Sequence, residues 1–175
     1  MPVGRRRIGW WSPDPRGVLP LEALRVPRSL RRSQARYEVT VDRAFRQVMV
    51  ACATQPRPHG WINGEFVDAY ERLHTVGVAH SVETWSPDGE LVGGLYGVSI
   101  GGFFAGESMF HRAVDASKVA LVRLVDILRT APGPVLLDIQ WTTEHLISLG
   151  AVDMDRDRYL ELIGPAMDGV APTWG

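Results

Sequence analysis

Cysteine is almost absent from this sequence, in which Cys52 is the single one among 175 residues. One chain can therefore form neither a disulfide framework nor a cysteine metal cluster, and we expect Cys52 on a buried helix face. Long apolar runs are also lacking, since none approaches the roughly 20 residues that span a bilayer, and residues 1–7 have no apolar signal-peptide core. These absences predict a cytoplasmic protein without a membrane partner.

Motifs for metals, nucleotides and hydrolytic nucleophiles are lacking as well. The chain has five histidines, namely His59, His74, His80, His111 and His145. They show no metal spacing such as H-E-x-x-H, so each is expected on the surface or in the core. Ser108 lacks the G-x-S-x-G turn of a hydrolase, and the glycine-rich GGLYGVSIGG matches neither a dinucleotide fingerprint nor a P-loop. We therefore expect no metal and no cofactor.

Net charge is small but unevenly distributed along the chain. The formal net charge of −1 excludes a protein that coats polyanions with its whole surface. Nine arginines precede position 40: Arg5, Arg6, Arg7, Arg16, Arg25, Arg28, Arg31, Arg32 and Arg36. Only Asp14, Glu22 and Glu38 oppose them there. This asymmetry indicates an anionic partner near the amino terminus, and the alternative is a solvated, partly flexible arm.

The periodicity of apolar residues predicts an α/β domain. At 175 residues and 45% hydrophobic content the chain can form one domain with an ordinary core. Helices are expected at 42–52, 65–75, 116–129, 142–149 and 156–163. An antiparallel meander is expected at 78–110, a further strand at 135–141, and a strand, basic helical turn and strand between 24 and 42. Asp42 and Asp115 each precede a helix and are expected to cap it.

Asp138 and Gln140 interrupt an otherwise apolar strand, VLLDIQW. Residues two apart in a strand share a face, so these two polar side chains are expected together, opposite Leu137 and Ile139. An unpaired buried carboxylate is costly, which favours a specific purpose for the pair. The alternative is an edge strand whose polar side faces water.

Glu107 is likewise a polar residue inside an apolar strand, FFAGESMF. Strand alternation predicts that it shares a face with Phe103, Ala105 and Met109. If the two strands lie near each other in the sheet, Glu107, Asp138 and Gln140 converge on one apolar hollow, as in a site for a small molecule or an acyl group.

A series of motifs in one order resembles the leucyl/phenylalanyl-tRNA-protein transferase family. They are WWSPDPRGVL, VTVDRAF, GWI, AYERLHTVGVAHSVE, LVGGLYGV, FFAGESMF, ASKVAL and LLDIQ, and the resemblance covers the chain from about Trp10 to Leu162. The resemblance implies a domain related to the GNAT acyltransferases, with a mixed, largely antiparallel sheet flanked by helices. It also implies transfer of leucine or phenylalanine, with some tolerance for methionine, from aminoacyl-tRNA to proteins beginning with Arg or Lys. The added residue marks those proteins for degradation by the N-degron route, and no cofactor takes part.

The resemblance assigns roles to individual residues. The family's catalytic aspartate, glutamine and glutamate fall on Asp138, Gln140 and Glu107. The pocket for the donor side chain falls on five apolar residues: Leu95, Phe104, Met109, Leu128 and Leu137. The base-stacking tryptophan falls on Trp61, and the basic cluster that holds the tRNA falls on Arg28, Arg31, Arg32 and Arg36.

A mechanism follows as a hypothesis from these roles. We expect Asp138 to orient Gln140, whose carbonyl oxygen accepts a hydrogen bond from the attacking α-amine. An amide is a very weak base, so Asp138 or a water is the candidate for final proton acceptor. Glu107 is expected to hold an amino group of the donor or of the acceptor.

One departure from the family pattern concerns the amino terminus. Family members usually begin with a further segment that ends in Phe-Pro-Trp, whose tryptophan pairs with the Trp61 equivalent around the terminal adenine. This chain has no such tripeptide, so we expect either a shortened chain or a stacking role for Trp10 or Trp11, beside their structural role in a proline-rich turn. The expected organisation is a remnant of that region at 1–22, a GNAT-like transferase domain at 23–170 and a tail at 171–175, in a monomer.

Two other functions stay open on the sequence alone. A shortened homologue that binds tRNA ends or basic amino termini without catalysis is compatible with the amino-terminal departure. A coenzyme A-dependent N-acetyltransferase is the second alternative, although FHRAVDASK lacks the Q/R-x-x-G-x-G/A pyrophosphate loop expected before the long helix.

Overall fold

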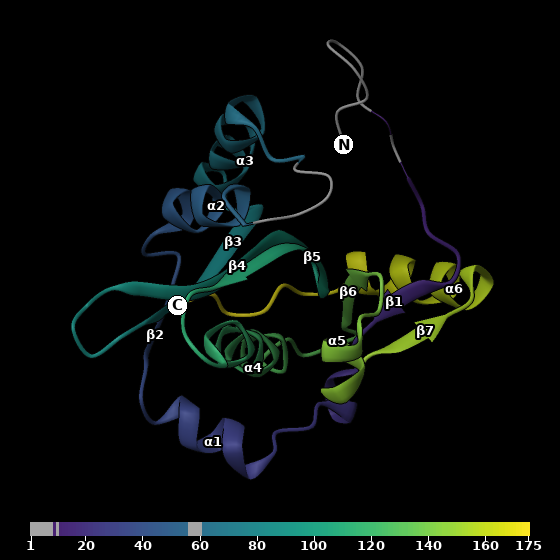
Figure 1. Cartoon of the computed structure of the whole chain (residues 1–175). Coiled ribbons are helices and arrows are strands. Elements are labelled where there is room, and N and C mark those ends of the chain that lie inside the picture. The colour runs from purple at the N-terminus through teal and green to yellow at the C-terminus, as the bar shows by residue number, and fades with distance from the viewer. Residues whose placement is uncertain (1–8, 10, 56–60) are drawn as a thin grey trace.

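The computed structural model describes residues 9, 11–55 and 61–175 of the chain (Figure 1). Its elements in chain order are β1 (Arg16–Val18), η1 (Leu21–Ala23), α1 (Arg28–Gln34), β2 (Glu38–Val41), α2 (Phe45–Ala53), α3 (Gly64–Thr75), β3 (Ala79–Trp85), β4 (Leu91–Ile100), β5 (Phe103–His111), α4 (Ala116–Leu128), β6 (Leu136–Gln140), α5 (Glu144–Ser148), β7 (Val152–Met154) and α6 (Arg156–Met167). None of the described helices is both long and apolar enough to cross a membrane.

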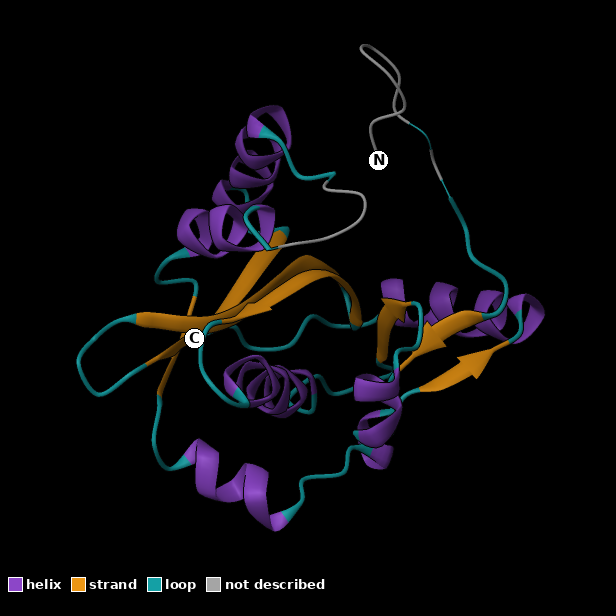
Figure 2. Cartoon of the chain, in the orientation of Figure 1, coloured by secondary structure: helices purple, strands orange, loops and turns teal. Residues whose placement is uncertain are grey.

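One seven-stranded sheet organises the fold, in the order β2-β3-β4-β5-β6-β1-β7 (Figure 2). The pair β5–β6 is parallel, and the other neighbouring pairs are antiparallel. This confirms the expected α/β architecture with a mixed, largely antiparallel sheet flanked by helices. The long α4 connects the parallel strands, as a parallel crossover requires.

Helices cover both faces of the sheet (Figures 1 and 2). Phe104 and Leu137 pack with α4 in the largest apolar cluster, whereas their neighbours Phe103 and Leu136 pack on the opposite face with Tyr159 of α6. A separate cluster joins α2 and α3 to the meander strands β3–β5. The two core layers follow from the alternation of apolar residues along β5 and β6.

The helices with strong apolar periodicity lie where they were predicted. Val48, Met49 and Cys52 form the buried face of α2, so the expected burial of Cys52 is confirmed. The long α4 is buried around most of its circumference, leaving Arg123 and Asp126 on its exposed stripe. The meander is confirmed as β3, β4 and β5.

One predicted strand near the amino terminus was wrong, and two short strands were not predicted. No strand forms at 24–26; the segment at 16–18 instead supplies β1, which pairs with β6 and β7 inside the sheet. The short β7 was not predicted. Both strands have three residues, and their pairing depends on partners distant in sequence, which local patterns do not report.

Neither predicted aspartate cap forms through its side chain. Asp42 adopts a left-handed φ of 57°, and its carboxylate accepts hydrogen bonds from His80 and from the Ser81 N–H rather than from α2. Asp115 occupies the N-cap position of α4 with a φ of 61°, but its carboxylate contacts Lys118 and the Ser33 hydroxyl. In both places a tertiary contact replaces the local cap.

Candidate active site

The strands β5 and β6 separate where the candidate residues lie. Their parallel pairing runs from Phe103 opposite Leu136 to Ala105 opposite Asp138 and ends there. Beyond that point the Gln140 Nε2 donates a 3.1 Å hydrogen bond to the Gly106 carbonyl oxygen and bridges the opening. Glu107, in the middle of β5, and Gln140, the last residue of β6, thus lie where the two strands diverge.

Two cavities meet at this opening. The first, here called the α3 cavity, has a volume of about 450 Å³ and is lined by α3 residues such as Phe66 and Tyr70. The second, the α4 cavity, has a volume of about 250 Å³ and is lined chiefly by apolar residues: Leu95, Met109, Leu121, Leu124, Leu137, Ile139 and Leu146. Four residues line both cavities: Trp61, Glu107, Gln140 and Trp141. The opening therefore joins a chamber lined largely by aromatic residues to one lined largely by aliphatic residues.

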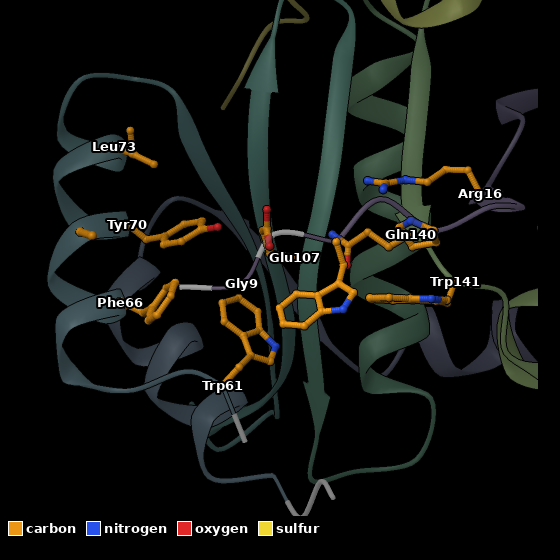
Figure 3. A pocket seen from close by; sticks show the side chains of 12 residues that line it. Gly9, Arg16, Trp61, Phe66, Tyr70, Leu73, Glu107, Gln140 and Trp141 are labelled. Atoms are coloured by element: carbon orange, nitrogen blue, oxygen red, sulfur yellow. The ribbon is translucent and has the colours of Figure 1, made fainter. Parts of the chain in front are cut away.

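Glu107 lies between the Tyr70 side of the α3 cavity and Gln140 (Figure 3). Burial raises the pKa of Glu107, and the nearby charge of Asp138 acts in the same direction, while a hydrogen bond from Tyr70 and the charge of Arg16 oppose the rise. Burial and the Glu107 charge together raise the pKa of Tyr70 as well, so its hydroxyl stays a donor. Glu107 is a carboxyl group placed against a cavity in partly apolar surroundings.

A β-bulge corrects the predicted orientation of Glu107. The β4–β5 register shifts so that Tyr96 is opposite Ser108 while Gly97 is opposite Gly106, which leaves Glu107 without an opposing residue. Met109 consequently packs with the α4 cluster, whereas Glu107 interacts with Tyr70 of α3. The prediction that they share a face was therefore wrong.

Asp138 is fully enclosed, with 0% of its side chain exposed. The Arg16 Nη2 donates to its Oδ2 at 2.7 Å, and the Arg16 Nε lies 3.1 Å from both carboxylate oxygens. The Tyr159 hydroxyl donates to Oδ2 at 2.7 Å, and the backbone N–H of Gln140 donates to Oδ1 at 2.7 Å. Asp138 is thus held by groups from β1, α6 and its own strand, and it lines neither cavity.

The backbone of Gln140 departs from regular strand geometry at the end of β6. Its φ is 65°, in the left-handed region that residues other than glycine adopt rarely. Gly17 of β1 makes room for this turn, because a Cβ there would stand 2.7 Å from the Trp141 carbonyl carbon. Since the Gln140 Nε2 is committed to Gly106, its Oε1 is the amide atom available to accept a hydrogen bond from a substrate.

The residues predicted for the donor pocket divide into two groups. Leu95, Met109 and Leu137 line the α4 cavity. Phe104 and Leu128 are both 0% exposed and belong to the core cluster around α4, without lining either cavity. The structure thus brings three of the five to the cavity surface.

Aromatic side chains surround the junction of the cavities. Trp61 lines both cavities and makes an edge contact with Phe66 at 5.4 Å between ring centroids. Trp11 lines the α3 cavity and is 54% exposed, whereas Trp10 lies outside the described residues. Trp141, the last residue of the strand expected at 135–141, also reaches both cavities and is 50% exposed.

The predicted basic cluster is exposed on and just after α1. Its members are Arg28, Arg31, Arg32 and Arg36. In Figure 1, α1 lies on the far side of α4 from α2 and α3. The Ser33 hydroxyl ties α1 to Asp115 at the start of α4, at 2.9 Å. None of the four arginines lines either cavity, so their predicted role is at a distance from the opening.

Sequence reasoning missed Arg16 and Tyr159. Arg16 lies within the motif WWSPDPRGVL, for which a proline-rich turn was expected, and Tyr159 lies on the predicted helix 156–163 without an assigned role. The unexplained cost of a buried Asp138 was the one signal that a cationic or hydroxyl partner had to exist. Across the described ranges, no group of three or more His, Cys, Asp or Glu side chains is arranged to hold a metal ion.

Comparison with known proteins identifies a family and several relatives. The family model described as leucyl/phenylalanyl-tRNA protein transferase matches residues 18–164. The leucyl/phenylalanyl-tRNA–protein transferase of Anaeromyxobacter sp. (strain K) is 54% identical over 166 residues, 92% of this chain and 70% of that protein. Its namesake from Syntrophotalea carbinolica is 51% identical over 171 residues, 95% of this chain and 73% of that protein.

Among solved structures, that of L-PGS from Bacillus licheniformis aligns with 92% of this chain and 57% of its own at 16% sequence identity. The TM-score of 0.49 is too low to support a conclusion on fold or function.

Proposed function

The chain belongs to the leucyl/phenylalanyl-tRNA protein transferase family of aminoacyltransferases, and from this membership we propose that it transfers leucine or phenylalanine from aminoacyl-tRNA to protein amino termini. The acceptors we propose begin with Arg or Lys and are thereby marked for the N-degron route. We also propose that the domain is related to the GNAT acyltransferases. The observation that carries the proposed activity is the junction of an aliphatic cavity and an aromatic cavity at Glu107 and Gln140.

The α4 cavity is the proposed site for the donor side chain. Leu95, Met109 and Leu137 offer it an apolar surface, and its volume of about 250 Å³ suits one leucine or phenylalanine side chain. Burial of an apolar side chain there stabilises the complex by about 1.5–3 kcal/mol. Because a missing methylene changes binding by only ~1–3 kcal/mol, some methionine is accepted too.

The α3 cavity is the proposed site for the acceptor amino terminus. The negative charge of Glu107 attracts a basic amino-terminal residue or its α-ammonium group. Tyr70, Phe66 and Trp61 line the same chamber, and aromatic faces add a favourable contact to a cationic side chain. A cation thus meets one carboxylate and several rings there.

The chemical step is aminolysis of the aminoacyl ester. The acceptor α-amine attacks the ester carbonyl carbon, a C–N bond forms, and the C–O bond to the terminal ribose breaks. The amine loses one proton and the leaving 3′ oxygen gains one, so the products are an amide and a free ribose hydroxyl. Gln140 Oε1 accepts a hydrogen bond from the amine and holds it in line, and such positioning is worth ~7 kcal/mol or more in well-oriented systems.

Two kinds of contact bind the tRNA in this proposal. The exposed arginines of α1 neutralise backbone phosphates without reading sequence, and Trp61 stacks on the unpaired terminal base. Stacking of this kind contributes about 1–3 kcal/mol per base. The proposal therefore separates affinity for tRNA from selectivity for the amino acid.

A transfer assay tests the proposal. Purified protein, leucyl-tRNA carrying radiolabelled leucine and a peptide beginning with Arg should yield a labelled peptide, whereas the same peptide beginning with Glu should stay unlabelled. Gln140→Ala should abolish transfer and still bind leucyl-tRNA. Binding of leucyl-tRNA by the unaltered protein without any transfer would instead support the non-catalytic binder and refute the enzyme.

A further inference from the structure

The Asp138 carboxylate has its hydrogen-bonding capacity filled by the protein itself. Its donors are the Arg16 Nε and Nη2, the Tyr159 hydroxyl and the Gln140 backbone N–H, at donor–acceptor distances of 2.7 to 3.1 Å. With 0% of the side chain exposed, neither a substrate amine nor water meets its oxygens from a cavity. Asp138 therefore does not have the surroundings of a proton acceptor for the transfer.

The donors come from segments that the fold brings together over long sequence distances. Arg16 is 122 residues from Asp138 and enters through β1, whose Gly17 pairs with Gln140. Tyr159 enters from α6, which packs on the sheet face that carries Leu136 and Val18, and the Arg16 guanidinium lies 5.3 Å from the Tyr159 ring centroid. Two elements thus converge on one carboxylate beside the opening.

The Asp138 carboxylate in turn stabilises an unusual backbone conformation at Gln140. Gln140 has a φ of 65°, which costs a non-glycine residue roughly 1–2 kcal/mol. The 2.7 Å bond from its own N–H to Asp138 Oδ1 fixes this turn of the backbone. The turn directs the Gln140 side chain across the opening, where Nε2 reaches the Gly106 carbonyl oxygen.

We propose that Arg16 and Tyr159 are positioning residues for aminoacyl transfer: they clamp Asp138, and Asp138 sets the backbone turn that presents Gln140 to the substrate amine. The inference rests on the proposed function and deepens it, because it assigns Asp138 to the support of Gln140. A misplacement of a reacting group by about 1 Å lowers rates by about 10²-fold. The arrangement predicts losses in kcat rather than in binding.

A rival role for Arg16 is direct contact with a substrate, since it also lines the α3 cavity and 15% of its side chain is exposed. A substrate contact predicts a raised KM for the peptide or the tRNA. A clamp predicts an unchanged KM and a lowered kcat, because the damage falls on the orientation of Gln140. The two roles therefore differ in which kinetic constant moves.

The test uses Tyr159→Phe, Arg16→Lys and Arg16→Ala in the transfer assay. We expect kcat to fall about 10-fold in Tyr159→Phe and about 10²-fold in Arg16→Ala, with each KM changed less than about twofold. Millimolar guanidinium should restore part of the activity of Arg16→Ala, while Arg16→Lys, which cannot donate through two parallel N–H groups, should stay impaired. Amide hydrogen exchange at Gln140 should accelerate in Tyr159→Phe.

Arg158→Ala is the matched control, because Arg158 is the exposed neighbour of Tyr159 and pairs with Glu161 at the surface. It should keep the activity of the unaltered protein. A raised KM with kcat intact, or an unchanged Gln140 exchange rate in Tyr159→Phe, would overturn the clamp. Tyr159→Phe removes one oxygen, so it decides the matter even if Arg16→Ala fails to fold. If the unaltered protein transfers nothing, the proposed function fails, and Gln140 exchange still tests the clamp separately.

Discussion

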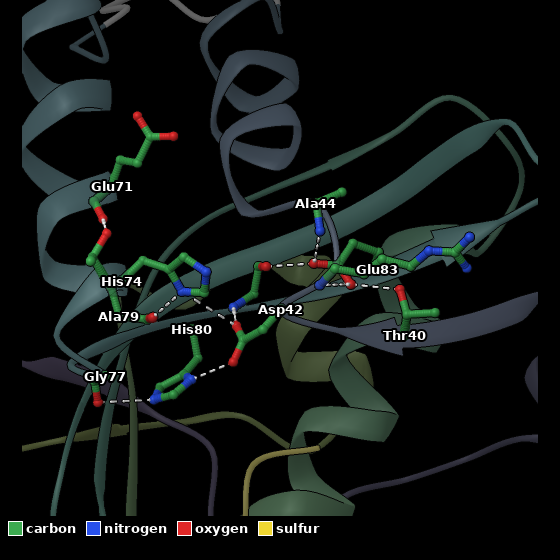
Figure 4. Close-up of polar contacts among 12 residues, drawn as sticks. Thr40, Asp42, Ala44, Glu71, His74, Gly77, Ala79, His80 and Glu83 are labelled. Carbon is green, nitrogen blue, oxygen red and sulfur yellow. Dashed lines mark hydrogen bonds and ion pairs between the residues drawn. The ribbon is translucent and has the colours of Figure 1, made fainter.

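Two glutamates of the same meander, Glu83 on β3 and Glu107 on β5, differ in how the surrounding protein satisfies their carboxylates. Glu83 is 0% exposed, and its carboxylate accepts hydrogen bonds from neighbouring donors (Figure 4). These are the hydroxyls of Ser81 and Thr40 and the backbone N–H groups of Arg43 and Ala44. The contacts join β2, β3 and the start of α2, so Glu83 fixes how these elements meet.

Glu107 receives a hydrogen bond from Tyr70 and otherwise faces the junction of two cavities. Burial raises its pKa because its charge is only partly compensated. The comparison teaches that a buried acid satisfied by donors of its own fold supports structure, whereas one left incompletely satisfied at a cavity is available for a substrate cation. Exchanging or removing their partners tests this difference.

The largest expected effect is on transfer by Glu107→Gln. The change keeps the shape of the side chain but removes the charge that holds an amino group, so we expect kcat/KM for an Arg-initiated peptide to fall about 10²-fold or more. Steady-state transfer assays at saturating leucyl-tRNA measure it. Glu83→Gln is the matched control and should retain its activity per folded molecule. Equal losses of kcat/KM in Glu107→Gln and Glu83→Gln would show that the two glutamates do not differ in function.

The second prediction concerns stability. Glu83→Ala leaves two buried backbone N–H donors and two hydroxyls without their acceptor, so we expect it to lower the free energy of unfolding by about 3 kcal/mol. Urea denaturation followed by circular dichroism measures the change. Glu90→Ala, at an exposed acid before β4, should change the free energy by less than about 0.5 kcal/mol. A comparable effect of both would show that Glu83 does not hold its elements together.

The third prediction is that removing the charge of Glu107 stabilises the protein, whereas removing the Glu83 side chain destabilises it. Because the pKa of Glu107 is raised in the fold, its contribution to stability is complete below the ordinary glutamate pKa of about 4.3 and is lost as pH rises through the raised value. Glutamine resembles the protonated form, so Glu107→Gln should raise the Tm at pH 7.5, by about 2–4 °C. The difference should vanish in scans near pH 4. A lower Tm at pH 7.5 would contradict the raised pKa.

Local patterns in the sequence predicted the elements whose burial repeats regularly. The apolar spacing of Val48 and Met49 in α2 and the nearly continuous burial of α4 are such cases. β1 could not be predicted, because Gly17 and its neighbours form a strand only by pairing with β6 and β7, which lie more than a hundred residues further along the chain. The organisation of the central sheet thus depended on contacts that no short window contains.

The candidate site was predictable in the same uneven way. A carboxylate inside each of two apolar strands indicated Glu107 and Asp138, and the strands do lie side by side. The bulge that separates Glu107 from the face of Met109 had one local signal in FFAGESMF, the isolated glycine Gly106, which simple alternation does not use. Arg16 and Tyr159 were missed because an arginine among prolines and a tyrosine on an amphipathic helix each have an ordinary local explanation, and Asp138 unites them only in three dimensions.

The smallest expected effects come from removing one donor from each glutamate. Thr40→Val removes one of several donors to Glu83 and also the acceptor of the Trp85 Nε1–H, so the free energy of unfolding should fall by about 0.5–1 kcal/mol with activity unchanged. Tyr70→Phe takes a hydrogen bond that lowers the pKa of Glu107, so that pKa should rise further. The acid limb of kcat/KM against pH should then move to higher pH. An unmoved acid limb in Tyr70→Phe would mean that the ionisation of Glu107 does not govern acceptor binding, and the contrast between the two glutamates would reduce to their burial.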